Sequence, residues 1–200
     1  MRTSSIILFI TVLLISVNGF SQRKSKPKRE VQPQLTLSEV HLKSFKARSI
    51  GPAIMGGRVS EIAIDPNDSY TFYVALGTGG VMKTSSNGAM FDAVFEKESV
   101  AAVGAVAVSP ANSNHVWVGT GEANDRNSSS WGNGVYHSTD GGGSWTNVGL
   151  KESKTIARIV LHPTDTNIAY VAAMGDLWSF GGERGLYKTT DGGKTWNAIL

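Results

Sequence analysis

Two polar segments of the sequence combine tryptophan, carboxylates and arginine. The first runs from Glu122 to Asn133 and the second from Gly175 to Arg184. Tryptophan rings can stack on sugars or clamp peptides, arginine can hold a carboxylate through two parallel hydrogen bonds, and carboxylates can act as acids or bases. The two segments therefore predict a site for a peptide or a glycan. The candidate ligand-binding residues are Arg58, Glu122, Asn124, Asp125, Arg126, Trp131, Asp176, Trp178, Glu183 and Arg184.

A second interpretation of the same residues stays open. They can tie two long loops to the rest of the fold through ion pairs and packing, and for any single carboxylate this structural role is favoured. Arg58 can equally bridge two structural units. The sequence assigns no catalytic residue. It predicts no metal and no cofactor, because the histidines lack the spacing of metal ligands and no glycine-rich phosphate loop opens a helix.

The elements that would position these segments repeat three times along the chain. Each repeat contains short runs of β-branched and aromatic residues, bounded by Pro, Asn, Asp and Gly, which predict four strands. No part of the repeats shows the apolar period of a helix. Four strands per repeat predict an all-β fold, a β-propeller with four-stranded blades at about 48–97, 98–150 and 151–200. Three blades cannot close a ring, so the remaining blades are expected from further sequence.

Each repeat ends in a glycine-rich turn followed by an aromatic residue, at 85–91, 138–145 and 189–196. These turns resemble the Asp box, Ser-x-Asp-x-Gly-x-Thr-Trp, also called the bacterial neuraminidase repeat. In the first turn we expect Asn87 to replace the aspartate and Phe91 the tryptophan. The aspartates can accept hydrogen bonds from turn amides, the glycines can adopt positive φ, and the tryptophans can cover the hairpin. Structural roles are therefore expected for Asp140, Gly142, Trp145, Asp191, Gly193 and Trp196.

In a propeller, loops that follow the first and third strands of a blade lie on one face. Loops that follow the second strand, and those that join blades, lie on the other. The two long segments are therefore predicted on the face opposite the Asp-box turns. The first repeat has only the short turn 77–80 at the corresponding place.

Residues 48–200 resemble propellers grouped with the sortilin N-terminal domain and with exported bacterial proteins labelled glycosyl hydrolases. The phrases at 49–52, 56–58, 118–122 and 186–196 carry the likeness. The sortilin resemblance implies peptide binding without catalysis. The sequence is also similar to the xyloglucan-active endoglucanases, whose general base lies in a Thr-Asp-x-Gly-Gly phrase. Alignment on Gly79 and Gly80 places Gly77 where that base belongs.

Sialidases are a third similar family, which holds a substrate carboxylate with three arginines. Arginines are present at 58, 126, 158 and 184, but the Arg-Ile-Pro phrase of that family is absent. Our leading hypothesis is an exported propeller that binds a peptide or glycan on the face opposite the Asp-box turns. The alternative is a xyloglucanase- or sialidase-like glycoside hydrolase, with part of its active site beyond residue 200. A structural propeller without a small ligand is the third hypothesis.

The first residues predict export. Arg2, the apolar run 6–17 and small residues at 19 and 21 are typical of a signal peptide at 1–21, followed by a basic, proline-containing linker at 22–47. We expect a secreted or periplasmic protein of bacterial type, with no membrane span after cleavage. From residue 31 onward acidic and basic residues nearly balance, so no nucleic-acid partner is predicted.

Overall fold

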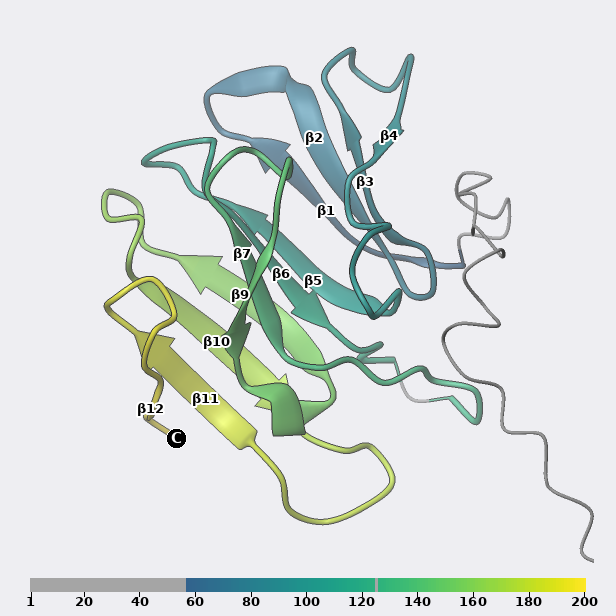
Figure 1. Ribbon diagram of the computed structural model, residues 1–200, viewed down its shortest axis with the longest axis vertical. Helices are drawn as coiled ribbons and strands as arrows, with labels where there is room; N and C mark the ends of the chain where they lie inside the picture. Colours follow the sequence, from purple (N-terminus) through teal and green to yellow (C-terminus); the bar gives the residue numbers. More distant parts are fainter. Residues whose placement is uncertain (1–56, 125) are drawn as a thin grey trace, which may run out of the picture. The chain divides into compact units, whose positions relative to one another are not determined.

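A computed structural model describes residues 57–124 and 126–200 of this protein, and Figure 1 shows three separate four-stranded antiparallel sheets in that part of the chain. The first sheet contains β1 (Val59–Asp65), β2 (Asp68–Leu76), β3 (Gly80–Thr84) and β4 (Asp92–Ala93). The second sheet contains β5 (Val103–Val108), β6 (Val116–Thr120), β7 (Val135–Ser138) and β8 (Thr146–Gly149). The third sheet contains β9 (Ile156–Leu161), β10 (Ala169–Met174), β11 (Arg184–Thr189) and β12 (Asn197–Ala198). The predicted all-β class with four-stranded sheets is confirmed. The predicted signal peptide, linker and phrase at 49–52 lie outside the described residues.

The helical content of the described residues is one 3-10 turn, η1 (Lys151–Ser153), between the second and third sheets. Nothing in the described residues forms a helix with the length and apolarity needed to cross a membrane.

The strands follow the alternation of the sequence. In β10, Ala169, Val171 and Ala173 are buried, while Tyr170 and Ala172 point to the other side of the sheet and stay partly exposed. Each sheet is a simple meander in which consecutive strands pair, so the loops after the second and third strands leave from opposite ends. This connectivity separates the long loops from the glycine-rich turns.

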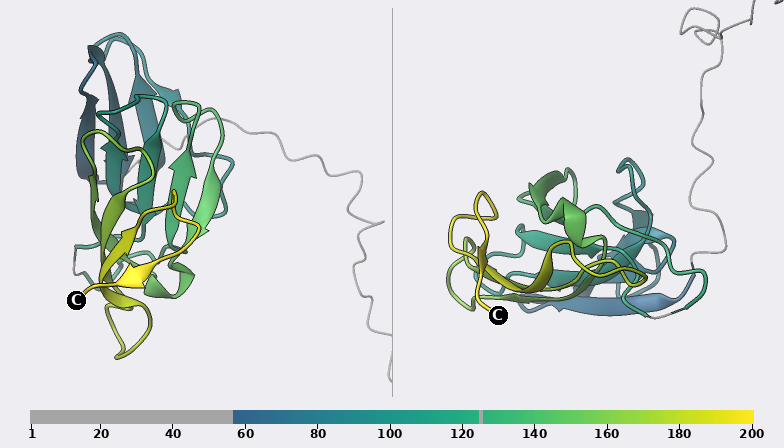
Figure 2. Two further views of the ribbon diagram at one scale, coloured as in Figure 1. Left: turned by 90° about the vertical axis from the view of Figure 1, so that its left-hand side faces the viewer. Right: turned by 90° about the horizontal axis from the view of Figure 1, so that it is seen from below.

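The three sheets stack face to face, as Figure 2 shows from two further sides. One buried cluster joins the first two sheets, with Tyr73 and Val81 against Val106 and Val118. A second cluster joins the second and third sheets, with Trp117 packed near Ile159 and Val171. Since burial of apolar side chains is the main stabilising term, each sheet depends on its neighbour for stability.

The outward sides of the stack remain apolar. Ile62 and Ile64 of β1 and Val160 of β9 are exposed on sheets that have a partner on one face only. In a complete ring such faces are covered by neighbouring blades. The described residues therefore form part of a β-propeller and not a closed one.

An equivalent hydrogen bond is present in each of the three glycine-rich turns. A hydroxyl oxygen at the first position of the turn accepts from the backbone N–H four residues later, at 3.0, 2.8 and 2.9 Å in chain order. The accepting residues are Thr84, Ser138 and Thr189, and the donors are Gly88, Gly142 and Gly193. We name these turns after their third residues: the Ser86 turn (84–91), the Asp140 turn (138–145) and the Asp191 turn (189–196).

The two aspartates close their turns with further hydrogen bonds. Asp140 Oδ1 accepts from the backbone N–H of Ser144 at 2.8 Å, and Asp140 Oδ2 accepts from the Ser144 hydroxyl at 2.7 Å. Asp191 has the same two bonds with Thr195. The bonds from the Ser144 and Thr195 side chains are the largest causes that lower the pKa of each aspartate to about 2.

The expectation that Asn87 replaces the aspartate of the first turn is wrong. Ser86 takes that place, because its hydroxyl oxygen accepts from the Met90 N–H at 3.0 Å, as Asp140 does from Ser144. Asn87 instead corresponds to Gly141 and has a φ of 53°, against 68° for the glycine. Asparagine tolerates this left-handed region better than most residues, which explains its presence there.

The tryptophans of two turns also join neighbouring sheets. Trp145 Nε1 donates to the carbonyl oxygen of Val94, next to β4, at 2.7 Å, and Trp196 Nε1 donates to that of Val148 in β8, also at 2.7 Å. Each indole therefore links its own sheet to the preceding one. Phe91, at the matching place in the Ser86 turn, has no side-chain N–H to donate.

A histidine pair near the Asp191 turn makes stability depend on pH. His137 stacks on Trp117, with ring centroids 4.1 Å apart, and its Nε2 lies 3.1 Å from Nδ1 of His115. Burial first, and then the charge of His115, lower the pKa of His137 from 6.5 to about 4. The unfolded chain therefore takes up a proton at higher pH than the folded one, and stability is lost as pH falls from 6.5 toward 4.

We expect this loss to reach about 1–2 kcal/mol, after allowance for the partial exposure of the ring. Melting temperatures of wild type and His137→Phe between pH 7 and pH 4 measure it, since phenylalanine keeps the stacking and cannot take up a proton. The variant should show a flatter profile in this range. Parallel profiles would contradict the assignment.

Candidate functional site

The two long loops leave the sheets at the end opposite the glycine-rich turns. The loop 121–134 joins β6 to β7, and the loop 175–183 joins β10 to β11. The turns that follow β7 and β11 contact the β5–β6 and β9–β10 loops instead, through N–H bonds from Gly141 to Asn114 and from Gly192 to Asn167. We call the end that carries the two long loops the insertion face; in Figure 1 these loops extend toward the lower right.

The start of β9 runs very close to the second sheet at the insertion face. Gly132 N–H donates to the Lys154 carbonyl oxygen at 2.7 Å. A Cβ on Gly121 would lie 2.8 Å from Thr155 Cα and still closer to the Lys154 carbonyl oxygen, and Gly121 has a φ of 88°. Glycine is required here both for the close approach and for the backbone conformation. This contact holds Lys154 beside the loop of the second sheet.

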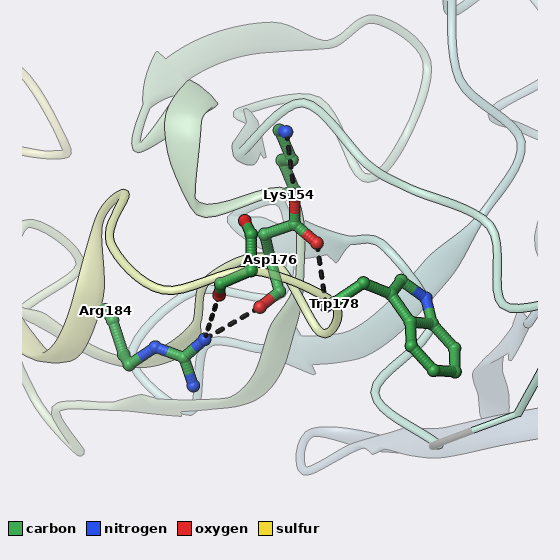
Figure 3. A network of polar contacts seen from close by, with 5 residues as sticks. Lys154, Asp176, Trp178 and Arg184 are labelled. Carbon is green, nitrogen blue, oxygen red and sulfur yellow. Dashed lines mark hydrogen bonds and ion pairs between the residues drawn. The ribbon is translucent and has the colours of Figure 1, made fainter.

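Lys154 is the centre of a polar network that spans both loops. Its Nζ lies 3.1 Å from Asp176 Oδ2 and 4.5 Å from the ring centroid of Trp131. Asp176 Oδ1 also accepts from the Trp178 N–H at 2.9 Å, as Figure 3 shows. The Trp178 N–H and, next, the Lys154 hydrogen bond are the largest causes that lower the pKa of Asp176, so this carboxylate is charged at neutral pH.

Arg184 and Glu183 form bonds within the protein. Arg184 Nη2 donates to the carbonyl oxygen of Asp176 at 2.7 Å and, at the longer distance of 3.4 Å, to the carbonyl oxygen of Ser179 (Figure 3). Glu183 Oε2 accepts from the Glu152 N–H at 2.9 Å. These bonds fix the shape of the loop 175–183. Arg184 is the first residue of β11.

Arg58 and Glu122 form an ion pair between the first and second sheets. The Glu122 side chain is 2% exposed, whereas the Arg58 side chain is 39% exposed. A buried carboxylate needs such a partner, since an unpaired charge in the interior is costly. The pair therefore joins two sheets at the insertion face, beside the short turn of the first sheet.

The other predicted residues of the loop 121–134 lie at its exposed outer part. Asn124 and Arg126 are exposed, and their backbone groups bond to the Ser129 hydroxyl. Asp125 lies outside the described residues. The structure thus brings Trp131 and Asp176 together around Lys154, with the Trp178 N–H bonded to Asp176, and it places Arg58 and Glu122 in a separate pair.

Large aromatic side chains remain exposed on both loops. Trp131 is 53% exposed and Trp178 is 58% exposed, and Phe180 is fully exposed at the tip of its loop. Leu177, Trp178, Phe180 and Arg184 line a shallow depression. Aromatic faces next to fixed polar groups are suited to bind rings that carry both apolar faces and hydroxyl groups.

Two features of the site were missed by sequence reasoning. Lys154 was not proposed, although it lies two residues before β9, in a linker between repeats. Its role depends on contacts between sheets that a single repeat does not reveal. Phe180 was named only as part of its segment, and its full exposure comes from the path of the loop. Among the residues that the structure describes, no three His, Asp or Glu side chains gather as metal ligands would.

Comparisons with known proteins identify the architecture. No model of a protein family matches the sequence, and no curated protein matches it. Among solved structures, an ancestral GH74 enzyme is similar with a TM-score of 0.56 and 29% identity, over 71% of this chain and 18% of that protein. The GH74 enzyme of Niastella koreensis is similar with a TM-score of 0.54 and 25% identity, over 71% of this chain and 22% of that protein.

A third similar structure is YCF48 bound to D1 peptide, with a TM-score of 0.50 and 17% identity, over 72% of this chain and 40% of that protein. This likeness shows the fold alone. The GH74 enzymes and YCF48 are β-propellers, and the three sheets described here are blades of an incomplete β-propeller. The chain spans less than a quarter of the length of the two GH74 enzymes.

Proposed function

We propose that this chain belongs to an exported propeller of the Asp-box type that binds a polysaccharide on the insertion face. The observation that carries the proposal is the exposure of Trp131 and Trp178 on two adjacent blades that the Lys154–Asp176 pair connects. Export through a signal peptide at 1–21 is part of the proposal.

The two tryptophans are well suited to sugar rings. Each offers a large apolar face, and its neighbour Lys154 or Asp176 supplies hydrogen-bond donors and acceptors in fixed positions. The exposed aromatic area is not explained by packing within the described blades, and such surface marks an interaction site. The likeness to the two GH74 glycoside hydrolases supports a glycan over a peptide.

Replacement of Trp131 or Trp178 by alanine is expected to weaken polysaccharide binding at least tenfold, because the loss of one stacked aromatic ring costs roughly 1.5 kcal/mol or more. Affinity electrophoresis of the full-length protein in gels with xyloglucan, mannan or pectin measures this loss and ranks the polysaccharides.

Met90→Ala is the matched control, since Met90 is an exposed large apolar residue in the Ser86 turn, at the end of the sheets opposite both long loops. The control variant should migrate as wild type does. Retention of full affinity in both tryptophan variants would refute the proposed site. If the protein bound unmodified peptides and none of the polysaccharides, the ligand of this site would be a peptide and the polysaccharide proposal would be wrong.

Glycoside hydrolysis is the second candidate function, and the likeness to GH74 enzymes favours it. The surroundings of Gly77 count against it. A Cβ at Gly77 would lie 3.4 Å from the carboxylate of Glu122, so a second carboxylate at position 77 would be forced against a buried negative charge. Glu122 is itself paired with Arg58. If the full-length protein releases reducing ends from xyloglucan, and Glu122→Gln or Asp176→Asn abolishes the release, the enzyme hypothesis replaces binding alone.

A further inference from the structure

A groove runs along β4 at the junction between the first and second blades, whereas the tryptophan site lies at the junction between the second and third. Its first part is lined by Val81, Phe95, Val100 and the short turn at 78–80, and has a volume of about 210 Å³. Its second part continues along Lys97 to Trp145 of the Asp140 turn. The two parts share Ala93, Glu96 and Glu98. We call this surface the junction groove.

The first part of the junction groove has an apolar floor and an acidic rim, whereas Lys97 lines only the second part. Phe95 is buried beneath it, packed edge to face against Tyr136 and Trp145 with ring centroids 5.1 and 5.3 Å apart. A tight turn follows, closed by the Glu98 N–H bond to the Phe95 carbonyl oxygen, and it brings Glu96 and Glu98 to the rim. Neither carboxylate forms an ion pair with another described residue.

The size and chemistry of the first part fit one side chain with an apolar stem and a positive end. Cavities for drug-sized molecules are larger, about 300–1,000 Å³. A sugar is a poor occupant, because Phe95 is the one aromatic residue among the described residues that line the first part, and its ring is packed under the surface with no exposed face to stack on. Lysine and arginine lay their methylene stems along apolar surface and keep the charged end at its border.

We propose that the junction groove binds a protein segment through one lysine or arginine side chain. Its stem lies along the partly exposed Ala93 and Val100, above the buried Phe95, and its charged end lies between Glu96 and Glu98. The rest of the segment follows the second part of the groove toward Trp145. This site uses a different blade junction from the polysaccharide site and a different chemistry, and it does not depend on the proposed function.

Saturation-transfer NMR with the full-length protein tests the proposal directly. The probes are three pentapeptides, Gly-Val-Lys-Val-Gly, the same peptide with arginine at the centre, and the same peptide with norleucine, which has the stem without the charge. The lysine and arginine peptides should bind with dissociation constants near or below about 1 mM. The norleucine peptide should bind about fivefold more weakly, the effect of two partly exposed ion pairs. Added salt should reduce the difference in dissociation constant between the lysine and norleucine peptides.

The double variant E96Q/E98Q should weaken binding of the lysine peptide about fivefold, because it keeps the shape of the rim and removes its charge. The matched control is E152Q/E183Q, which removes two carboxylates from the insertion face. Unchanged binding to E96Q/E98Q, equal binding of the norleucine peptide, or no binding of the lysine peptide would each overturn the proposal. Polysaccharide binding should be the same in E96Q/E98Q and wild type.

Discussion

Replacement of Gly121 by alanine is expected to destabilise the propeller by about 2–4 kcal/mol and to abolish polysaccharide binding. A Cβ at this position meets the backbone of Lys154 and Thr155, which cannot move aside as a flexible side chain can. The φ of 88° adds backbone strain for any residue other than glycine. Since the same contact holds Lys154 beside Trp131, separation of the two blades here disrupts the site as well as the packing.

Gly181→Ala is the control that isolates the contact. Its φ of 97° lies in the same region, but no atom lies within 4 Å of the added Cβ. The Gly181→Ala variant should lose only about 1 kcal/mol of stability, from backbone strain alone. Urea denaturation of the full-length protein compares the two variants. Equal losses would show that the close approach of the blades contributes nothing.

Arg58→Met is expected to destabilise the protein by about 3 kcal/mol, and more than Glu122→Leu does. Removal of Arg58 leaves the buried Glu122 carboxylate without its cation, whereas removal of Glu122 leaves an arginine that water already reaches. The double variant R58M/E122L should be more stable than R58M, because it leaves no unpaired charge in the interior.

Denaturation midpoints of the two single variants and the double variant, in one urea series, measure this asymmetry. Additive losses would show that the two side chains act independently. A larger loss in Glu122→Leu than in Arg58→Met would contradict the assignment of Glu122 as the buried partner.

Much of the fold could be predicted from the sequence because each strand carries its own pattern. The alternation in β10 and the turn residues that flank it specify a half-buried strand without knowledge of its neighbours. The meander then fixes which loops share an end, so the long loops and the glycine-rich turns could be placed apart.

The details that escaped prediction all depend on contacts between segments. Asn87 was aligned with the aspartates by residue type, but the hydrogen bonds of Thr84 and Ser86 set the true register. The bonds from Trp145 and Trp196 to carbonyl groups of the preceding blades also have no signal within one repeat.

The same limit applied to the candidate site. Trp131 and Trp178 stood out because large aromatic residues are rare in polar loops. The composition could not show that Arg184 and Glu183 form bonds to backbone groups of the protein itself. It also could not show that Lys154 connects the two loops, because that residue reaches them only when two blades pack together.

Hydrogen–deuterium exchange of the full-length protein, with and without the polysaccharide that it binds most tightly, is the most direct measurement of where the ligand lies. Protection is expected in the loops 121–134 and 175–183 and at Lys154, with no change in the Asp140 and Asp191 turns. Protection concentrated in those turns, with exchange in the two loops unaltered, would contradict the account.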